Sequence, residues 1–206
     1  MRVSPIVESE PLAARHESET PRPRDRSALV AGAALVALVL VATLEIAHFT
    51  TQAPTWYLMS DELLWEKLGL SIYETGSPLP HVRGLGVEAY SGLYPLLTSI
   101  AYARGDMQDA FRAVHQVNAL LMASAAIPAY LLARGVLASR VAALIAAALT
   151  IAVPWTSLSV MVMSESAAYP AFIWAMFAMH RAMVRSSLGA DALALAGLAV
   201  ATYSRT

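Results

Sequence analysis

The sequence predicts an all-α protein, a polytopic bundle of transmembrane helices with interfacial helices in a long first outer loop. Three observations lead to this prediction. Of the 206 residues, 57% are hydrophobic and only 14% are charged, whereas soluble domains are roughly 45 to 50% apolar. Several apolar stretches approach the length of about 20 residues with which an α-helix crosses a bilayer. A long segment rich in acids separates the first of these stretches from the second.

The N-terminal part divides into a polar tail and a first span. Residues 1–27 are rich in Pro, Glu, Ser and Arg and lack apolar periodicity, which is typical of a disordered segment. Residues 29–49 are apolar apart from Glu45 and His48. This stretch exceeds the apolar region of a signal peptide, about 7 to 15 residues, and further spans follow it, so we expect an uncleaved anchor.

The charges on either side of the first span predict its orientation. Arg22, Arg24 and Arg26 precede the span and are opposed only by Asp25. Because basic residues stay on the inner side, we expect a multi-pass plasma-membrane protein with a cytoplasmic N-terminus. The segment 50–111 then lies outside, with seven acids against three bases: Asp61, Glu62, Glu66, Glu74, Glu88, Asp106 and Asp109 against Lys67, Arg83 and Arg104.

The outer loop, residues 50–109, opens with a predicted amphipathic helix. Ser60 suits an N-cap, Asp61 and Glu62 fall in the first turn, and Gly76 ends the helix. An apolar stripe and nearby aromatic residues favour a position at the bilayer interface, with the carboxylates at the boundary with water. The stripe consists of Leu64, Trp65, Leu68 and Ile72, and Trp56 and Tyr57 precede it.

The remainder of the chain is expected to form a loop, a surface helix and four further spans. Proline and glycine predict a loop over 77–92, and a short surface helix follows at 93–103. Asp106 then caps the next helix. The spans are expected at about 110–132, 141–156, 158–180 and 188–204. Arginines flank the turn at 134–140 and follow the fourth span, which puts both places inside. Since the fifth span ends with the sequence, we expect an N-terminal part of a longer protein.

These features resemble the GT-C superfamily of membrane glycosyltransferases, and more closely its bacterial members related to protein O-mannosyltransferases. In that group DE, DD or ED in the first outer loop carries the catalytic acid, which corresponds to Asp61 and Glu62. The stretch MVMSESAAYPAF, which contains Glu165, and the ending LAVATYSRT are similar to the fourth span and the end of the fifth. The later spans and soluble outer domain of the larger members are absent from this sequence.

The resemblance implies transfer of a sugar from a polyprenyl-phosphate donor, a lipid-linked partner, to an acceptor hydroxyl on the outer side. Such a reaction needs a base for the hydroxyl. We assign the base to Asp61, the first acid of the pair, and expect its neighbour and partial burial to strengthen it. Glu62 either orients the acceptor or supports a divalent metal. The alternative is that both acids only complement the helix N-terminus, at about 0.3 to 1 kcal/mol each.

Arginines are the candidates for binding the donor phosphate, because guanidinium forms paired hydrogen bonds with phosphate oxygens. The three candidates are Arg83, Arg112 and Arg205, and Arg205 is the best placed, at the outer end of the fifth span. The alternative is an arginine that reaches to the lipid headgroups. Glu165 lies in the outer half of the fourth span, where an ionised acid needs a partner. We expect it to pair with one of these arginines, as structural support or as a substrate contact.

The sequence gives little support for nucleic-acid binding, cysteine chemistry or a histidine metal site. There is no basic tract for nucleic acid and no cysteine, which excludes thiolate and disulfide chemistry. His81 and His115 lack partners at ligand spacing, so no metal site is predicted from them. Two other classes remain open, a transporter component with Glu45 and Glu165 as pathway residues and a non-catalytic multispan protein. Acids in a loop helix favour the enzyme, and acids at mid-membrane favour the transporter.

Overall fold

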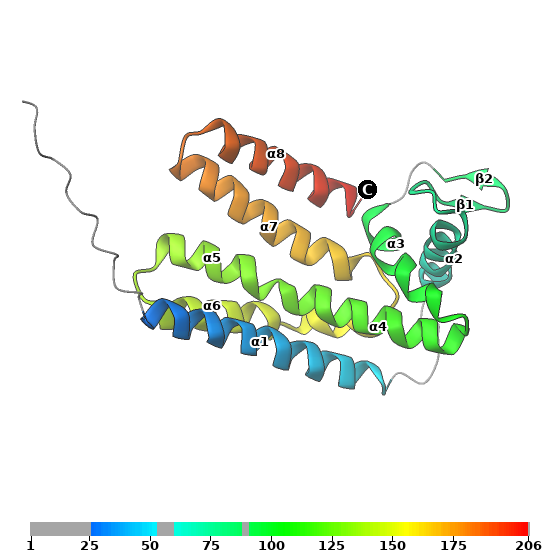
Figure 1. Ribbon diagram of the computed structural model, residues 1–206, viewed down its shortest axis with the longest axis horizontal. Coiled ribbons are helices and arrows are strands. Elements are labelled where there is room, and N and C mark those ends of the chain that lie inside the picture. Colours follow the sequence, from blue (N-terminus) through cyan, green and yellow to red (C-terminus); the bar gives the residue numbers. More distant parts are fainter. Residues whose placement is uncertain (1–25, 53–59, 88–90, 206) are drawn as a thin grey trace, which may run out of the picture.

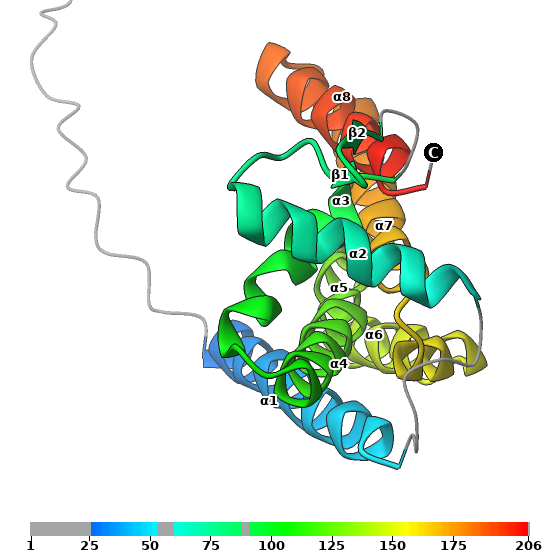
Figure 2. The ribbon, with the colours of Figure 1, turned by 90° about the vertical axis from the view of Figure 1, so that its right-hand side faces the viewer.

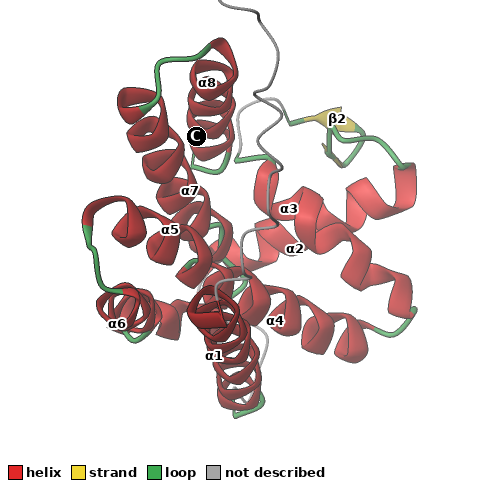
Figure 3. Ribbon diagram, turned by 60° about the vertical axis from the view of Figure 1, so that its left-hand side comes forward, coloured by secondary structure: helices red, strands yellow, loops and turns green. Residues whose placement is uncertain are grey.

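The computed structural model describes residues 26–52, 60–87 and 91–205. This part of the chain is almost entirely helical, as expected, and a short hairpin is its one pair of strands (Figures 1 and 3). In chain order the elements are α1 (Arg26–Thr50), α2 (Ser60–Thr75), β1 (His81–Val82), β2 (Leu85–Gly86), α3 (Leu93–Thr98), the 3-10 helix η1 (Ser99–Arg104), α4 (Met107–Ser124), α5 (Ala126–Val136), α6 (Arg140–Ile151), the 3-10 helix η2 (Pro154–Val160), α7 (Glu165–Val184) and α8 (Leu188–Tyr203).

The long helices form a bundle, and the outer-loop elements gather at one end of it. Helices α1 and α4 to α8 run roughly along one direction, while α2, α3 and the hairpin lie together beyond their ends (Figure 1). Seen along the bundle, α2 crosses this end (Figure 2). The last turn of α8 reaches the same end, and the first turn of α1 lies at the opposite one (Figure 1).

Two helical stretches are long and apolar enough to cross a membrane. They are Arg26–Thr50, which is α1, and Met107–Val136, which comprises α4 and α5. Helices α6 and α8 are also apolar but shorter. Helix α1 matches the span expected at 29–49, although the predicted tail does not extend to residue 27, because Arg26 and Ser27 already belong to the helix. The remainder of that tail, 1–25, lies outside the described residues.

The second expected span is two helices that meet at Ala125. The stretch Met107–Val136 contains the range expected at 110–132, and its helical hydrogen bonding is interrupted at Ala125 because Pro128 stands in the first turn of α5. Proline has no N–H for an i→i−4 bond, and its ring crowds the carbonyl of the residue four positions earlier. That residue is Ser124, the last of α4, so the chain ends one helix and starts another.

The third and fourth spans also differ from expectation. Helix α6 ends at Ile151 rather than near 156, because Pro154 forces the preceding Val153 into an extended conformation with ψ 151°. Helix α7 begins at Glu165 rather than at 158. Residues 161–164, which we call the break, separate η2 from α7 and are not helical. By contrast, α8 occupies the range expected for the fifth span.

The outer loop contains structure where only a loop was expected. Strands β1 and β2 pair antiparallel, with His81 opposite Gly86. Arg83 and Gly84 form the turn with φ of 55° and 79°, and two successive positive φ values are typical of a tight hairpin turn. The backbone N–H of His81 donates to Ser71 Oγ at 2.9 Å. The hairpin is thereby attached to α2.

The apolar stripe of α2 packs against protein, and the position of this helix at the bilayer interface stays a prediction. Trp65, Leu68 and Ile72 are buried. Gly69 lies beneath Tyr102 of η1, where an added Cβ atom would come within 2.8 Å of the ring. Helix α2 is therefore packed on α3 and η1. Trp56 and Tyr57, the aromatic residues expected at the interface, lie outside the described residues.

Candidate functional site

The two adjacent acids at the start of α2 lie in different surroundings. Successive side chains on a helix point about 100° apart, so the two cannot share one environment. Asp61 is exposed, whereas Glu62 is buried, with 1% of its surface accessible. Glu62 Oε2 accepts a hydrogen bond of 3.0 Å from the backbone N–H of Val162, in the break. Asp61 is therefore open to a substrate, and the partial burial expected for it is not found.

Polar side chains of α4 hold the chain where η2 passes into the break. Asn118 Nδ2 donates to the carbonyl oxygens of Ser159 and Met161, at 3.3 and 3.0 Å. Both ring nitrogens of buried His115 lie 2.9 Å from backbone carbonyl oxygens, one of which belongs to Val160. Backbone groups that leave a helix inside a protein need other partners. Glu62 from α2 and these two residues from α4 supply them.

Tyr94 of α3 lies in the interior between these groups. Its ring is fully buried and meets Trp65 edge to face, with ring centroids 5.8 Å apart. Burial raises the pKa of the Tyr94 hydroxyl, the Asn118 side chain opposes the rise, and the charges of Glu62 and Glu165 add to it. Both acids thus act on one hydroxyl, although one comes from α2 and the other from α7.

An ion pair joins the start of α7 to the end of α8. Glu165 Oε1 binds Arg205 Nη1, which confirms the prediction that Glu165 pairs with an arginine. The glutamate side chain is 12% exposed and the arginine side chain 62%. Nearby, the Tyr203 side chain at the end of α8 lies against Gly92, where an added Cβ atom would overlap its hydroxyl and require the side chain to move.

The other two candidate arginines lie elsewhere. Arg83 is exposed in the turn of the hairpin. Arg112 lies on the exposed side of α4, and its Nη1 is 3.2 Å from Asp109 Oδ1. Of the three arginines, Arg205 is the one that the described contacts join to Glu165. Glu165 therefore supports a candidate phosphate ligand at Arg205 alone.

Metal ligands do not gather in the described ranges. Residues 26–52, 60–87 and 91–205 contain no group of three or more His, Cys, Asp or Glu side chains that could hold an ion. His81 is exposed on β1, and His115 takes part in the packing of α4 against η2. Glu62 accepts a hydrogen bond from the Val162 backbone.

Sequence reasoning missed the part played by Tyr94, His115 and Asn118. The three-residue spacing of Arg112, His115 and Asn118 does mark a polar face on an apolar helix. Buried polar side chains require partners, so this spacing was the available signal. Their partners are backbone carbonyls of a segment whose side chains look like an apolar span. The sequence therefore gives no sign of where these partners lie.

Comparison with known proteins adds no family to these observations. No family model, curated protein or solved structure matches the chain.

Proposed function

We propose that this chain is a membrane glycosyltransferase, which transfers a sugar from a polyprenyl-phosphate donor to an acceptor hydroxyl on the outer side of the membrane. One observation carries the proposal. The exposed acid Asp61 is on α2, and Arg205, paired with Glu165, follows α8; α2 and the last turn of α8 lie at the same end of the bundle (Figure 1). Transfer to a hydroxyl needs a base for that hydroxyl and a positive group for the leaving phosphate.

The surface of α1 supports the placement in a membrane. Only 11% of its most apolar window is buried within the protein. Burial of one large apolar side chain is worth about 1.5 to 3 kcal/mol, so a helix with this many exposed apolar side chains is most stable in lipid. The exposed set is Leu29, Val30, Val36, Leu40, Val41, Leu44 and Phe49.

The distribution of arginines supports the orientation. The α5–α6 turn and the α7–α8 turn lie at the end of the bundle where α1 begins (Figure 1). These places carry Arg134, Arg140, Arg181 and Arg185, and Arg140 Nη1 hydrogen-bonds to Ser27 Oγ at the start of α1. An arginine-rich end is the cytoplasmic end of a membrane protein. Helix α2, at the other end, then lies outside.

Within this site Asp61 acts as the base and Glu62 positions it. The Glu62 carboxylate already accepts from Val162, which fixes the first turn of α2 against the break. Asp61 is exposed beside it and can receive the proton of an acceptor hydroxyl. Arg205 binds the donor phosphate, because a guanidinium has five N–H donors. Its side chain is 62% exposed and is also paired with Glu165.

The transporter interpretation is less well supported. It requires Glu45 and Glu165 to face one pathway, but Glu45 is exposed on α1 and Glu165 pairs with Arg205. A non-catalytic membrane protein would require neither the exposed acid Asp61 nor the exposed guanidinium of Arg205 at this end of the bundle.

The decisive measurement is release of polyprenyl phosphate from a polyprenyl-phosphate hexose by membranes that contain the protein. This readout does not require the acceptor to be known. Asp61→Asn should slow release by about 10² to 10⁴-fold, the usual contribution of a general base. Glu74→Gln, an exposed acid at the other end of α2, is the matched control and should leave the rate unchanged. Equal rates in Asp61→Asn and the unsubstituted protein, at equal expression, would remove Asp61 from the reaction.

A further inference from the structure

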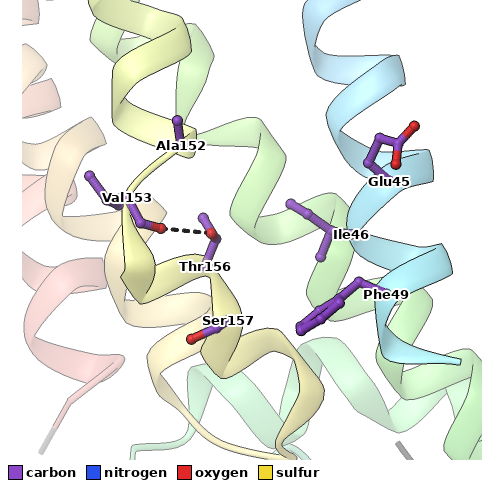
Figure 4. Close-up of a pocket in the computed structure, with 7 residues that line it drawn as sticks. All are labelled: Glu45, Ile46, Phe49, Ala152, Val153, Thr156 and Ser157. Atoms are coloured by element: carbon purple, nitrogen blue, oxygen red, sulfur yellow. Dashed lines mark hydrogen bonds between the residues drawn. The ribbon is translucent and has the colours of Figure 1, made fainter. Parts of the chain in front are cut away.

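The two ends of the bundle differ in charge. Acids and bases are mixed at the end where α2 lies, and there the carboxylate of Glu45 points away from the groove of about 410 Å³ between α1 and η2 (Figure 4). The described residues at the opposite end carry one acid, Asp191 in the first turn of α8. The bases at that end are all arginines: Arg26, Arg134, Arg140, Arg181 and Arg185. This end is therefore strongly basic.

The ends of α5 and α7 meet within this basic region. His180 of α7 lies against Gly135 of α5, where an added Cβ atom would come within 2.6 Å of His180 Nε2. Arg134 precedes Gly135 in the chain, and Arg181 follows His180. The contact thus brings one arginine from each helix to the same part of the surface. Arg185 follows Arg181 by about one turn, at the C-cap of α7.

These three arginines have N–H groups that the protein does not use. Arg134 Nη1 donates to the carbonyl oxygens of Leu137 and Ala138, at 2.8 and 2.7 Å, which holds the side chain at the end of α5 and leaves its Nε and Nη2 donors. Arg181 and Arg185 are exposed. Across residues 26–52, 60–87 and 91–205, no acid pairs with any of the three. Guanidinium groups of this kind bind phosphate through paired hydrogen bonds.

Large apolar side chains are exposed beside the same arginines. Met183 and Leu188 are 79% and 88% exposed, and Val136 and Val184 are exposed as well. Basic residues interleaved with exposed apolar ones are typical of a surface at the boundary between lipid and water. In the orientation proposed above, this end faces the cytoplasmic leaflet, whose surface is negatively charged. Both the charge and the apolar side chains then face groups that they match.

We propose that the patch formed by Arg134, Arg181 and Arg185 binds an anionic phospholipid of the inner leaflet, phosphatidylglycerol. The guanidinium groups bind the phosphodiester, and Val136 and Met183 lie against the acyl chains. A zwitterionic headgroup binds less well, because its own cation is repelled by the arginines. The proposal rests on the membrane placement and orientation proposed above and is independent of sugar transfer.

The test is lipid retention by the purified chain in detergent, measured by native mass spectrometry after exchange with equal amounts of phosphatidylglycerol and phosphatidylcholine. We expect phosphatidylglycerol to be retained in preference. A basic residue near an anionic surface is worth about 1 kcal/mol, a factor of about five. The double variant Arg181→Gln with Arg185→Gln should therefore lower retention about 25-fold. Lysine at both positions keeps the charge and should restore most of it. Arg83→Gln, at an exposed position in the hairpin, is the matched control and should change nothing.

Several outcomes would overturn the proposal. Equal retention of the two lipids, or a loss in Arg83→Gln as large as in the double variant, would show that the patch does not select an anionic headgroup. Displacement of the lipid by soluble glycerol phosphate would assign the arginines to a free phosphate ligand. Labelling of Ala138→Cys by an impermeant maleimide in intact cells would contradict the inner leaflet. Absence of sugar release bears on none of these results, so the two proposals fail separately.

Discussion

Asp61 and Glu62 differ by one methylene group and one position, yet their environments assign them different tasks. Asp61 is exposed, and in the proposed function it takes the proton of the acceptor hydroxyl. The buried acid, Glu62, accepts a hydrogen bond from the Val162 N–H. The consequences of removing each one should therefore differ in kind, in catalysis for Asp61 and in stability for Glu62.

Glu62→Ala should destabilise the fold by about 1 to 3 kcal/mol, because it leaves the buried Val162 N–H without its acceptor. Glu62→Gln retains an amide oxygen at this position and should cost less. Asp61→Ala should cost no more than about 1 kcal/mol, the value of an acid at a helix N-terminus. Melting temperatures measured in detergent should therefore be lowest for Glu62→Ala and higher for Glu62→Gln and Asp61→Ala. A Glu62→Ala protein as stable as the unsubstituted chain would show that the bond to Val162 is dispensable.

The buried hydroxyl of Tyr94 predicts a loss of stability in alkali. Burial raises its pKa above the ordinary value near 10, so between these values the unfolded chain gives up a proton that the folded chain keeps. Stability is then complete below about pH 10 and falls as the pH rises further. Melting temperatures from about pH 8 to pH 11 should fall less steeply in Tyr94→Phe. Tyr73→Phe, at an exposed position on α2, should follow the unsubstituted curve, and a Tyr94→Phe curve identical to it would contradict the prediction.

At the scale of elements, α2 is held by close packing on η1. Gly69→Ala would place a Cβ atom 2.8 Å from the ring of buried Tyr102. Overpacking of this kind costs about 1 to 3 kcal/mol, which outweighs a gain of about 1 kcal/mol in helix propensity. We therefore expect a lower melting temperature. Gly32→Ala on α1, where nothing lies within 4 Å of the added atom, should show no loss, and equal behaviour of the two variants would show that α2 is free to shift.

The ranges of α1, α2 and α8 could be predicted from local signals. Acids in the first turn and Gly76 mark α2, and apolar runs bounded by polar residues mark the other two. The break before α7 could not be predicted in this way, because residues 158–163 look as apolar as the helix that follows. Its backbone is bound by side chains from α2 and α4, some 40 to 100 positions away in the chain. Only the tertiary structure brings these groups together.

At the scale of the whole molecule, the two ends of the bundle should differ in access from outside the cell. Ser77→Cys, between α2 and the hairpin, should react with an impermeant maleimide in intact cells. Ala138→Cys, exposed in the α5–α6 turn, and Ser9→Cys should react only after lysis. These outcomes follow from the arginines at one end of the bundle. Labelling of Ala138→Cys but not Ser77→Cys in intact cells would reverse the orientation.

The sequence also predicted the helical class of the molecule, and one pairing in its candidate site. The sequence predicts that Glu165 pairs with one of three arginines, because an acid among apolar residues needs a cation. The choice of Arg205 over Arg83 and Arg112 depends on α7 and α8 lying antiparallel, with small residues such as Gly197 and Ala175 in contact. No local pattern encodes that contact.

The tether between Glu62 and Val162 has a mechanical consequence. Val162 precedes Glu165 by three residues, and Glu165 forms an ion pair with Arg205 just after the end of α8. If the chain is the proposed glycosyltransferase, a displacement of α2 when an acceptor binds would pull on the first turn of α7 and shift the Arg205 guanidinium proposed to bind the donor. In the proposed enzyme, an acceptor at α2 and a donor at Arg205 would then be mechanically coupled through residues 161–164.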